Sequence, residues 1–385
     1  MKTLAAVFLA ALAAHAAGIA LFCALHDDAL EAHTPSNQST WAYGKLFQRW
    51  DGQYYGGIAR TGYKGSRHMA AFFPLYPWLM APLHRLGVDS AVAGVIVSSL
   101  AFALACALAW HLSGRVRKRS GAWTVALLVC SPVLVFYTAV YSESLFLLMS
   151  LLTFWLAGEI PAEGEGPRAP GRPAAAALCA GFLLCLVRPQ GFIVLAAICA
   201  AQLIAGEGRR RLHAAWWALP VAAAVVVLAS ANMRYGNKPL DWLNAQSAWS
   251  RRPTLPWVAV RDDVRHLLHG VKENPTGTAA CGVRDDVLRL FDLASICVGL
   301  AVAWWWLSMR RWALGLFAAA GILVPLLTGN LLSIGRFTFA SPAVALGLGA
   351  WLSARPLPAR LAVPPALLGV GIYFGYRFTH WCFAG

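Results

Sequence analysis

The sequence predicts an all-α fold that crosses a membrane many times. Hydrophobic residues make up 59% of the 385 residues, and the mean hydropathy is +0.58. Charged residues make up only 13% of the chain, about half the share usual in soluble proteins. Apolar runs of about 20 residues, the length needed to cross the hydrocarbon core, recur from one end of the chain to the other. A soluble protein of this size would need a more highly charged surface.

We expect about eleven membrane-spanning helices, give or take one. The first is interpreted as an uncleaved helix rather than a signal peptide, because its apolar run is long enough to span. Two of the segments, 174–188 and 190–206, are short and could form a closely coupled pair or be partly re-entrant. The expected spans are 4–25, 90–112, 122–140, 142–158, 174–188, 190–206, 213–232, 288–308, 312–328, 336–353 and 361–376.

The net charge of +15 reflects orientation in a membrane rather than nucleic-acid binding. The basic residues lie in short clusters between apolar runs, and short basic loops stay in the cytoplasm. We therefore expect the N-terminus inside and the C-terminus outside. The clusters that set this orientation are residues 115–119, 209–211, 310–311 and 355–360.

The chain is expected to form one membrane-embedded domain, 1–385, with two long outer loops at 26–89 and 233–287. The cytoplasmic segment 159–173 is rich in Gly, Pro and Glu, which is typical of a flexible linker. Most of the nine Cys lie in apolar runs and show no metal-ligand spacing. No metal site is expected. Cys281 and Cys382 fall on the same predicted side, so a disulfide between them is possible.

Residues 49–63 predict a short helix along the membrane surface. Trp50, Tyr54 and Ile58 recur at i, i+4 and i+8, so they share one helix face, and Gly62 is a plausible C-terminal stop. Asp51 would begin this helix. It could be an N-cap, or it could be the general base that removes the proton of an attacking hydroxyl in an inverting glycosyl transfer.

Residues 71–77 contain two prolines three apart, Pro74 and Pro77, which predict an irregular segment rather than a helix. Its aromatic residues would hold it at the interface; a simple helix-entry turn is the other interpretation. Tyr76 of this segment, with Tyr54 and Tyr55, is a candidate to contact a sugar ring.

Three ionisable residues stand at the outer ends of predicted helices. Glu143 is either a functional carboxylate at membrane depth or a stabiliser of its own helix start. Arg188 and Arg336 are either ligands of a lipid-linked phosphate or snorkelling anchors. Gln190, two residues after Arg188, is a further candidate for contact with the donor.

The second outer loop contains Gln246 and Trp249, followed by Arg251 and Arg252, which could bind a sugar and its phosphate or simply fold as a surface loop. His68 is a weak donor-site candidate. The sequence has no P-loop, dinucleotide fingerprint, GxSxG or HExxH motif. The cytoplasmic loops are too short for a nucleotide-sugar domain, so a lipid phosphate is the expected carrier of the sugar.

The order WDGQYY, IARTGY and FFPLYP over residues 49–79 resembles the PIG-V family. These are mannosyltransferases that add the second mannose to glycosylphosphatidylinositol anchors, together with bacterial relatives, in the GT-C superfamily of membrane glycosyltransferases. Looser similarity occurs at residues 141–146, 188–191 and 335–337. The resemblance implies a GT-C-type helical bundle, a polyprenyl-phosphate sugar as donor, and inverting transfer without a metal or cofactor on the non-cytoplasmic face. It also implies that Asp51 is the catalytic base.

The expected function is transfer of a hexose, with mannose suggested by the family, to an acceptor on the outer face. The acceptor could be a glycolipid, a polymer or a protein. The Ala- and Arg-rich composition suggests a bacterial inner membrane. A transporter or flippase of a lipid-linked substrate is the main alternative. It would be expected to show inverted repeats and a polar midplane, neither of which the sequence indicates. A phosphatase or ligase would need a denser cluster of His, Arg and Asp.

Overall fold

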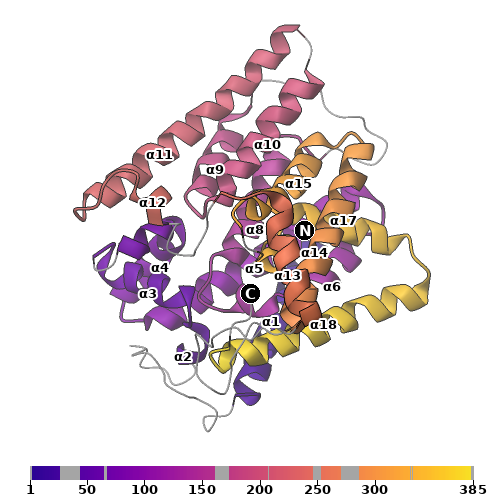
Figure 1. Cartoon of the computed structure of the whole chain (residues 1–385), viewed down its shortest axis with the longest axis horizontal. Coiled ribbons are helices and arrows are strands. Elements are labelled where there is room, and N and C mark those ends of the chain that lie inside the picture. Colours follow the sequence, from indigo (N-terminus) through magenta and orange to yellow (C-terminus); the bar gives the residue numbers. More distant parts are fainter. Residues whose placement is uncertain are drawn as a thin grey trace.

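A computed structural model of the chain describes residues 2–26, 44–64, 67–160, 173–206, 208–245, 253–269, 286–329, 331 and 333–382. Within these ranges the fold is entirely helical and contains no strand, as the sequence predicts. The helices pack into one bundle, with a group of shorter helices at one end (Figure 1).

Five helices of the described chain are long and apolar enough to cross a membrane, which confirms the polytopic all-α class. Five shorter apolar helices accompany them, so the total of eleven spans stays a prediction. The long helices are α1 (Lys2–Ala24), α5 (Ser90–Val116), Arg211–Met233, which includes α11 (Ala218–Met233), α14 (Asp286–Ser308) and α18 (Leu357–Thr379). The shorter ones are α8 (Glu143–Leu156), α9 (Ala175–Cys185), α10 (Gln190–Ala205), α15 (Trp312–Leu326) and α17 (Pro342–Ser353).

Two predicted spans are broken into two helices each, which corrects the sequence analysis. The span 122–140 divides into α6 (Gly121–Val129) and α7 (Leu134–Thr138), and 336–353 divides into α16 (Ile334–Phe339) and α17. Each break contains a Ser-Pro pair, and proline cannot donate a backbone hydrogen bond to the preceding turn. The second break leaves Arg336 on a short helix of its own.

The described part of the segment predicted as the first outer loop consists of short helices. It comprises α2 (Gly44–Phe47), α3 (Asp51–Thr61), η2 (Arg67–Ala71) and α4 (Leu75–Arg85). The predicted helix and its stop are confirmed, because α3 ends at Gly62, which adopts a φ of 71° that disfavours side chains with a Cβ. Whether α3 lies along the membrane surface stays a prediction.

The prediction that the two prolines exclude a regular helix is wrong for Pro77. Pro74 is the N-cap of α4, and Pro77 lies in its first turn, where the backbone N–H groups have no intrahelical acceptor in any case. The helix even continues through Pro82. The segment 71–77 therefore joins the end of η2 to the start of α4, which agrees with the helix-entry interpretation.

Helix α11 runs along α9 and ends, with α12, beside the first loop (Figure 1). After η3 (Gly208–Trp217), α11 runs to α12 (Asp241–Asn244), which packs against η2. The Phe73 and Trp242 rings meet edge to face at 5.7 Å, and the Tyr63 and Tyr235 rings lie 6.1 Å apart. The start of the segment predicted as the second outer loop thus contacts the segment predicted as the first.

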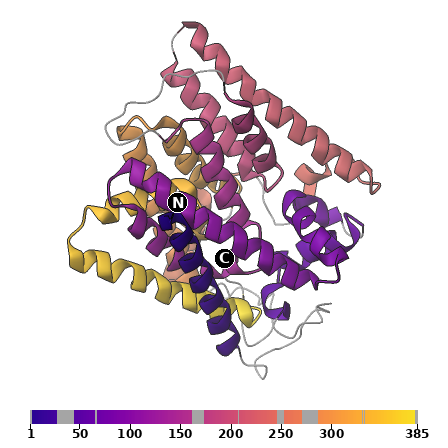
Figure 2. The ribbon, with the colours of Figure 1, turned by 180° about the vertical axis from the view of Figure 1, so that it is seen from behind.

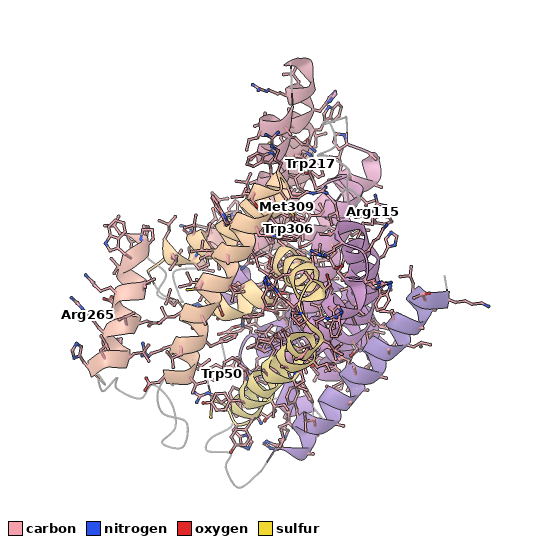
Figure 3. All side chains as sticks on the ribbon, turned by 90° about the vertical axis from the view of Figure 1, so that its right-hand side faces the viewer. Trp50, Arg115, Trp217, Arg265, Trp306 and Met309 are labelled. Atoms are coloured by element: carbon pink, nitrogen blue, oxygen red, sulfur yellow. The ribbon has the colours of Figure 1, made fainter. Side chains whose placement is uncertain are left out.

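The bundle has two chemically different ends. Helix α1 packs along α5, as seen from behind in Figure 2, and α14 packs on α15. Trp50 lies at one end, whereas Trp217 and Met309 lie toward the other (Figure 3). We call the first the site end. We call the second the basic end, because Arg115, in the last turn of α5, lies toward it (Figure 3) and Arg310 directly follows Met309. Arg360, at the start of α18, lies against Trp123 at the start of α6, the helix that follows α5.

Candidate active site

Four charged side chains predicted separately from the sequence meet at the site end. Arg188 Nη1 lies 2.9 Å from Glu143 Oε1, and Arg336 Nε lies 3.1 Å from the same oxygen. Arg336 Nη2 lies 3.4 Å from Asp51 Oδ2. The residues come from α3, the start of α8, the α9–α10 connection and α16, so only the folded bundle assembles them.

The cluster is balanced in charge but unequal in exposure. The Glu143 side chain is 1% exposed and both arginine side chains are 10% exposed, whereas Asp51 is 26% exposed. Two carboxylates and two guanidinium groups compensate one another, which burial requires. Asp51 is therefore the member of the cluster that an entering molecule reaches most easily.

Asp51 is presented by an unusual helix start. The N-cap position belongs to Trp50, which adopts a φ of 50° and makes no side-chain capping bond. Asp51 is the first helical residue, and its backbone N–H donates to the Tyr141 hydroxyl at 3.2 Å. Because the Asp51 carboxylate faces Arg336, the N-cap interpretation of this residue is wrong.

Arg336 is held from behind by α14. The backbone N–H of Gly335 donates to Asp292 Oδ1 at 2.9 Å, and Asp292 is 3% exposed. A Cβ at position 335 would collide with the Phe291 ring, so only glycine permits α16 to approach α14 this closely. Ser333, just before the helix, adopts a left-handed φ of 67°. The turn that carries Arg336 is thus closely constrained.

Aromatic rings support both guanidinium groups. The Arg336 guanidinium lies 5.0 Å from the Phe136 ring centroid and 5.5 Å from that of Tyr141. Phe337 serves both arginines, with its centroid 5.3 Å from each. Cation–π contacts of this kind are strongest in desolvated sites. They fix the planes of the two guanidinium groups without using their N–H donors.

Glu143 holds both arginines as ion pairs. Its two oxygens and Arg336 Nε are buried, and none makes a hydrogen bond of acceptable geometry within the described residues. The nitrogen–oxygen distances are nevertheless those of ion pairs. Glu143 begins α8, so it occupies the helix start predicted for it as well as the cluster.

The protonation of Asp51 reflects competing neighbours. Burial raises the pKa of its carboxyl above the ordinary value, Arg336 opposes this rise, and Glu143 adds to it. The net direction is upward, which makes Asp51 a better proton acceptor than an exposed aspartate. Burial also raises the pKa of the nearby Tyr55 hydroxyl, which therefore stays neutral.

Of the other predicted residues, Gln190 is closest to the cluster. Its Oε1 accepts a hydrogen bond from Arg188 Nε at 3.0 Å. Tyr55 is buried and its hydroxyl lies 2.9 Å from Ser142 Oγ, beside Glu143. Tyr54 is partly exposed and stacks on Phe72 at 4.6 Å.

Tyr76 and His68 lie elsewhere. Tyr76 is fully buried, donates to the Gly94 carbonyl at 3.0 Å and contacts Ser98 Oγ at 2.8 Å. This geometry gives it a packing role. His68 is exposed on η2. Gln246 and Trp249, with Arg251, Arg252 and Cys281, lie outside the described residues.

A cavity of about 100 Å³ opens beside Arg188. Arg188, Gln190 and Phe337 line one side of it, and its remaining walls come largely from apolar residues of α10, α15 and α17. A cationic rim on an apolar hollow suits an anion that carries a hydrocarbon chain. No group of three potential metal ligands occurs in the searched, described part of the chain. Cys382 is disulfide-bonded.

Sequence reasoning missed Asp292. It is a carboxylate inside an apolar span, and such groups are functional candidates by default, so a signal was present. Asp263 and Arg289 were missed as well; they form a buried ion pair at 2.8 Å between α13 (Pro256–His269) and α14. The stacking role of Phe337 has no sequence signal, because it depends on two arginines from different helices.

Comparisons with solved structures give distant similarities. The apo oligosaccharyltransferase of Archaeoglobus fulgidus matches with 12% identity and a TM-score of 0.46, covering 99% of this chain and 56% of that one. Archaeal oligosaccharyltransferase AglB from Archaeoglobus fulgidus, in complex with an inhibitory peptide and a dolichol-phosphate, matches with 14% identity and a TM-score of 0.40, covering 97% of this chain and 56% of that one. Arabinofuranosyltransferase AftD from Mycobacteria matches with 17% identity and a TM-score of 0.38, covering 83% of this chain and 22% of that one. The chain thus spans about half the length of the oligosaccharyltransferase. No curated protein matches it.

The family comparison covers the first part of the chain. Residues 7–161 match the family model described as Mannosyltransferase (PIG-V). This region contains Asp51 and Glu143, whereas Arg188 and Arg336 lie beyond it. The resemblance predicted from the motifs in residues 49–79 is therefore confirmed: over residues 7–161 the chain is similar to the PIG-V mannosyltransferase family.

Proposed function

We propose that this protein is an inverting glycosyltransferase that moves a hexose from a polyprenyl-phosphate donor to an acceptor on the outer face of the membrane. The observation that carries the proposal is the meeting of a partly exposed carboxylate, Asp51, with two buried arginines, Arg188 and Arg336. The family match supports a glycosyltransferase and makes mannose the first sugar to test.

Each part of the cluster has one role in this mechanism. The Asp51 carboxylate accepts the proton of the acceptor hydroxyl as its oxygen forms a bond to C1 of the sugar. The bond between C1 and the phosphate oxygen breaks, and its electron pair leaves with the phosphate. Arg188 and Arg336 stabilise the negative charge that grows there. The part of the polyprenyl chain next to the phosphate would enter the apolar cavity of about 100 Å³ beside Arg188.

The ion pair of Arg336 with Asp51 links donor binding to base activation. A donor phosphate is a stronger partner for a guanidinium than a carboxylate 3.4 Å away. When Arg336 turns to the phosphate, Asp51 loses a neighbour that lowers its pKa. The base then becomes more basic as the donor binds. Glu143, which contacts both arginines, keeps them oriented during this exchange.

A transporter or flippase of a lipid-linked substrate is the second candidate. Its carrier site would be expected near the membrane midplane, whereas the charged cluster gathers at the starts of α3, α8, α10 and α16. The family match also favours transfer. We therefore place the transporter second.

The test is transfer from a panel of radiolabelled polyprenyl-phosphate sugars by the purified protein, with a total lipid extract as acceptor. Wild type is compared with Asp51→Asn and with Asp262→Asn, an exposed carboxylate on α13. We expect Asp51→Asn to lower the rate by about 10²–10⁴-fold, the usual contribution of a general base, and Asp262→Asn to leave it unchanged. Near-normal turnover by a folded Asp51→Asn protein would show that the base is another group.

A further inference from the structure

A second cavity lies between the helices toward the basic end. It has a volume of about 590 Å³ and is bounded by α6, α14, α16, α17 and α18. Its walls are almost wholly apolar, including Val302, Leu348 and Leu367. This volume falls within the roughly 300–1,000 Å³ of typical ligand pockets. A groove of this kind accepts a hydrocarbon chain.

Helices α14 and α17 approach each other closely at the wall of the groove. A Cβ on Gly347 of α17 would lie 2.8 Å from Val302 Cγ1, so glycine lets α17 approach α14 there. Trp306 Nε1 donates to the Ala343 carbonyl at 2.9 Å and fixes the two helices together. Helices α6 and α18 contribute the lining residues Leu127, Val363 and Leu367, and Trp304, which also lines the groove, is 74% exposed.

Arginines mark the end of this groove. The Arg355 guanidinium lies 4.6 Å from the ring centroid of Trp351, which lines the groove. Arg360 lies 5.5 Å from the Trp123 centroid, and Val363, one turn further along α18, lines the groove. Neither arginine forms an ion pair within the described residues. The Nε of Arg360 is buried and makes no hydrogen bond there.

We propose that this groove binds an anionic diacyl phospholipid from the membrane leaflet at the basic end. One acyl chain would lie along Leu348 and Leu367, and the phosphate would contact Arg355 and Arg360. Positive charge without a carboxylate partner, next to an apolar channel, complements an anionic head group with an apolar tail. The two arginines lie toward the basic end, away from Asp51, so the proposed head-group site does not depend on the proposed transfer reaction.

The probe is phosphatidylglycerol, compared with phosphatidylcholine carrying the same acyl chains. The purified protein is equilibrated with each lipid and the retained lipid is counted by native mass spectrometry. We expect wild type to retain phosphatidylglycerol preferentially. Each arginine near a lipid surface favours an anionic lipid by about fivefold. The double variant Arg355→Ala/Arg360→Ala should therefore lose about 25-fold of the preference.

Two further variants separate charge from fit. Arg355→Lys/Arg360→Lys keeps the charge and should recover most of the preference. Ala301→Trp fills the groove and should lower retention of both lipids. Arg211→Ala is the matched control, because it also removes one arginine. Arg211 lies on η3, which packs on α9, α10 and α11, and none of these helices lines the groove.

Equal retention of the two lipids by wild type would overturn the proposal. So would a preference that survives removal of both arginines in a protein with an unchanged unfolding temperature. Displacement of phosphatidylglycerol by a polyprenyl phosphate at equal concentration would assign the groove to a lipid carrier instead.

Discussion

The two ends of the bundle use arginine in opposite ways. At the site end, Arg188 and Arg336 are buried and share the Glu143 carboxylate. At the basic end, Arg355 and Arg360 stack on tryptophan rings and have no carboxylate partner in the described chain. A carboxylate partner fixes the direction of a guanidinium group, whereas a guanidinium without such a partner stays available to bind an anion. The first arrangement suits catalysis, which needs geometry, and the second suits retention of a lipid, which needs only attraction.

The largest expected effect on stability comes from removing the carboxylate at the centre of the site end. Glu143→Gln leaves two buried guanidinium groups and one carboxylate in the cluster, that of Asp51, which pairs with Arg336. Breaking a buried ion pair in this way costs about 3–5 kcal/mol, so we expect a clear fall in the unfolding temperature measured by a fluorescence melt. Asp262→Asn removes an exposed pair and should cost at most about 1 kcal/mol. Similar small shifts in both variants would contradict the central role of Glu143.

A smaller loss is expected at the support behind Arg336. Asp292→Ala removes the acceptor of the Gly335 N–H and should destabilise the protein by about 1–3 kcal/mol. Because the Arg336 turn loosens, the KM for the donor should rise more than kcat falls. Asp292→Asn retains an oxygen acceptor and should recover part of the KM. Equal KM values in the Ala and Asn variants would make Asp292 a packing residue only.

The pH dependence sharpens the electrostatic side of the comparison. Asp51 must be deprotonated to act as a base, so activity falls as the pH drops through its raised pKa. The acid limb of kcat/KM should lie above the range of an exposed aspartate. Arg336 lowers this pKa more than Arg188 does. Arg336→Gln should therefore move the limb further upward than Arg188→Gln. A limb that moves downward, or moves equally in both variants, would contradict this assignment.

The smallest effect is expected at the basic end. Arg355→Ala removes one cation–π contact at an exposed position, which is worth about 0.5–1 kcal/mol. The unfolding temperature and the rate of sugar transfer should therefore stay close to those of wild type. A large loss of transfer in this variant would mean that the two ends of the bundle are coupled.

Much of the helical plan could be predicted from the sequence because hydropathy acts locally. The span predicted at 190–206 is α10 at Gln190–Ala205, and the one predicted at 90–112 is α5 at Ser90–Val116. The breaks at 131–132 and 341–342 were not predicted, because the surrounding residues are as apolar as an unbroken span. Pro77 misled the prediction for the opposite reason: proline excludes a helix interior but not a first turn.

The candidate site could be predicted as residues but not as an arrangement. Asp51, Glu143, Arg188 and Arg336 were each recognisable as polar groups at the ends of apolar runs. Asp51 and Arg336 are 285 residues apart, and nothing local relates them. Tyr76 shows the limit of such reasoning. Its motif predicted contact with a ligand, whereas the residue is fully buried in the core.

The sequence by itself determined the membrane environment, the helical class and the residues able to carry charge at the site end, since each depends on the solvation of a side chain or of one helix. Tertiary structure decided that Glu143 lies between two arginines, that Asp292 supports one of them, and that an apolar groove opens beneath Gly347. These features depend on how closely distant helices approach, and that distance is set by packing.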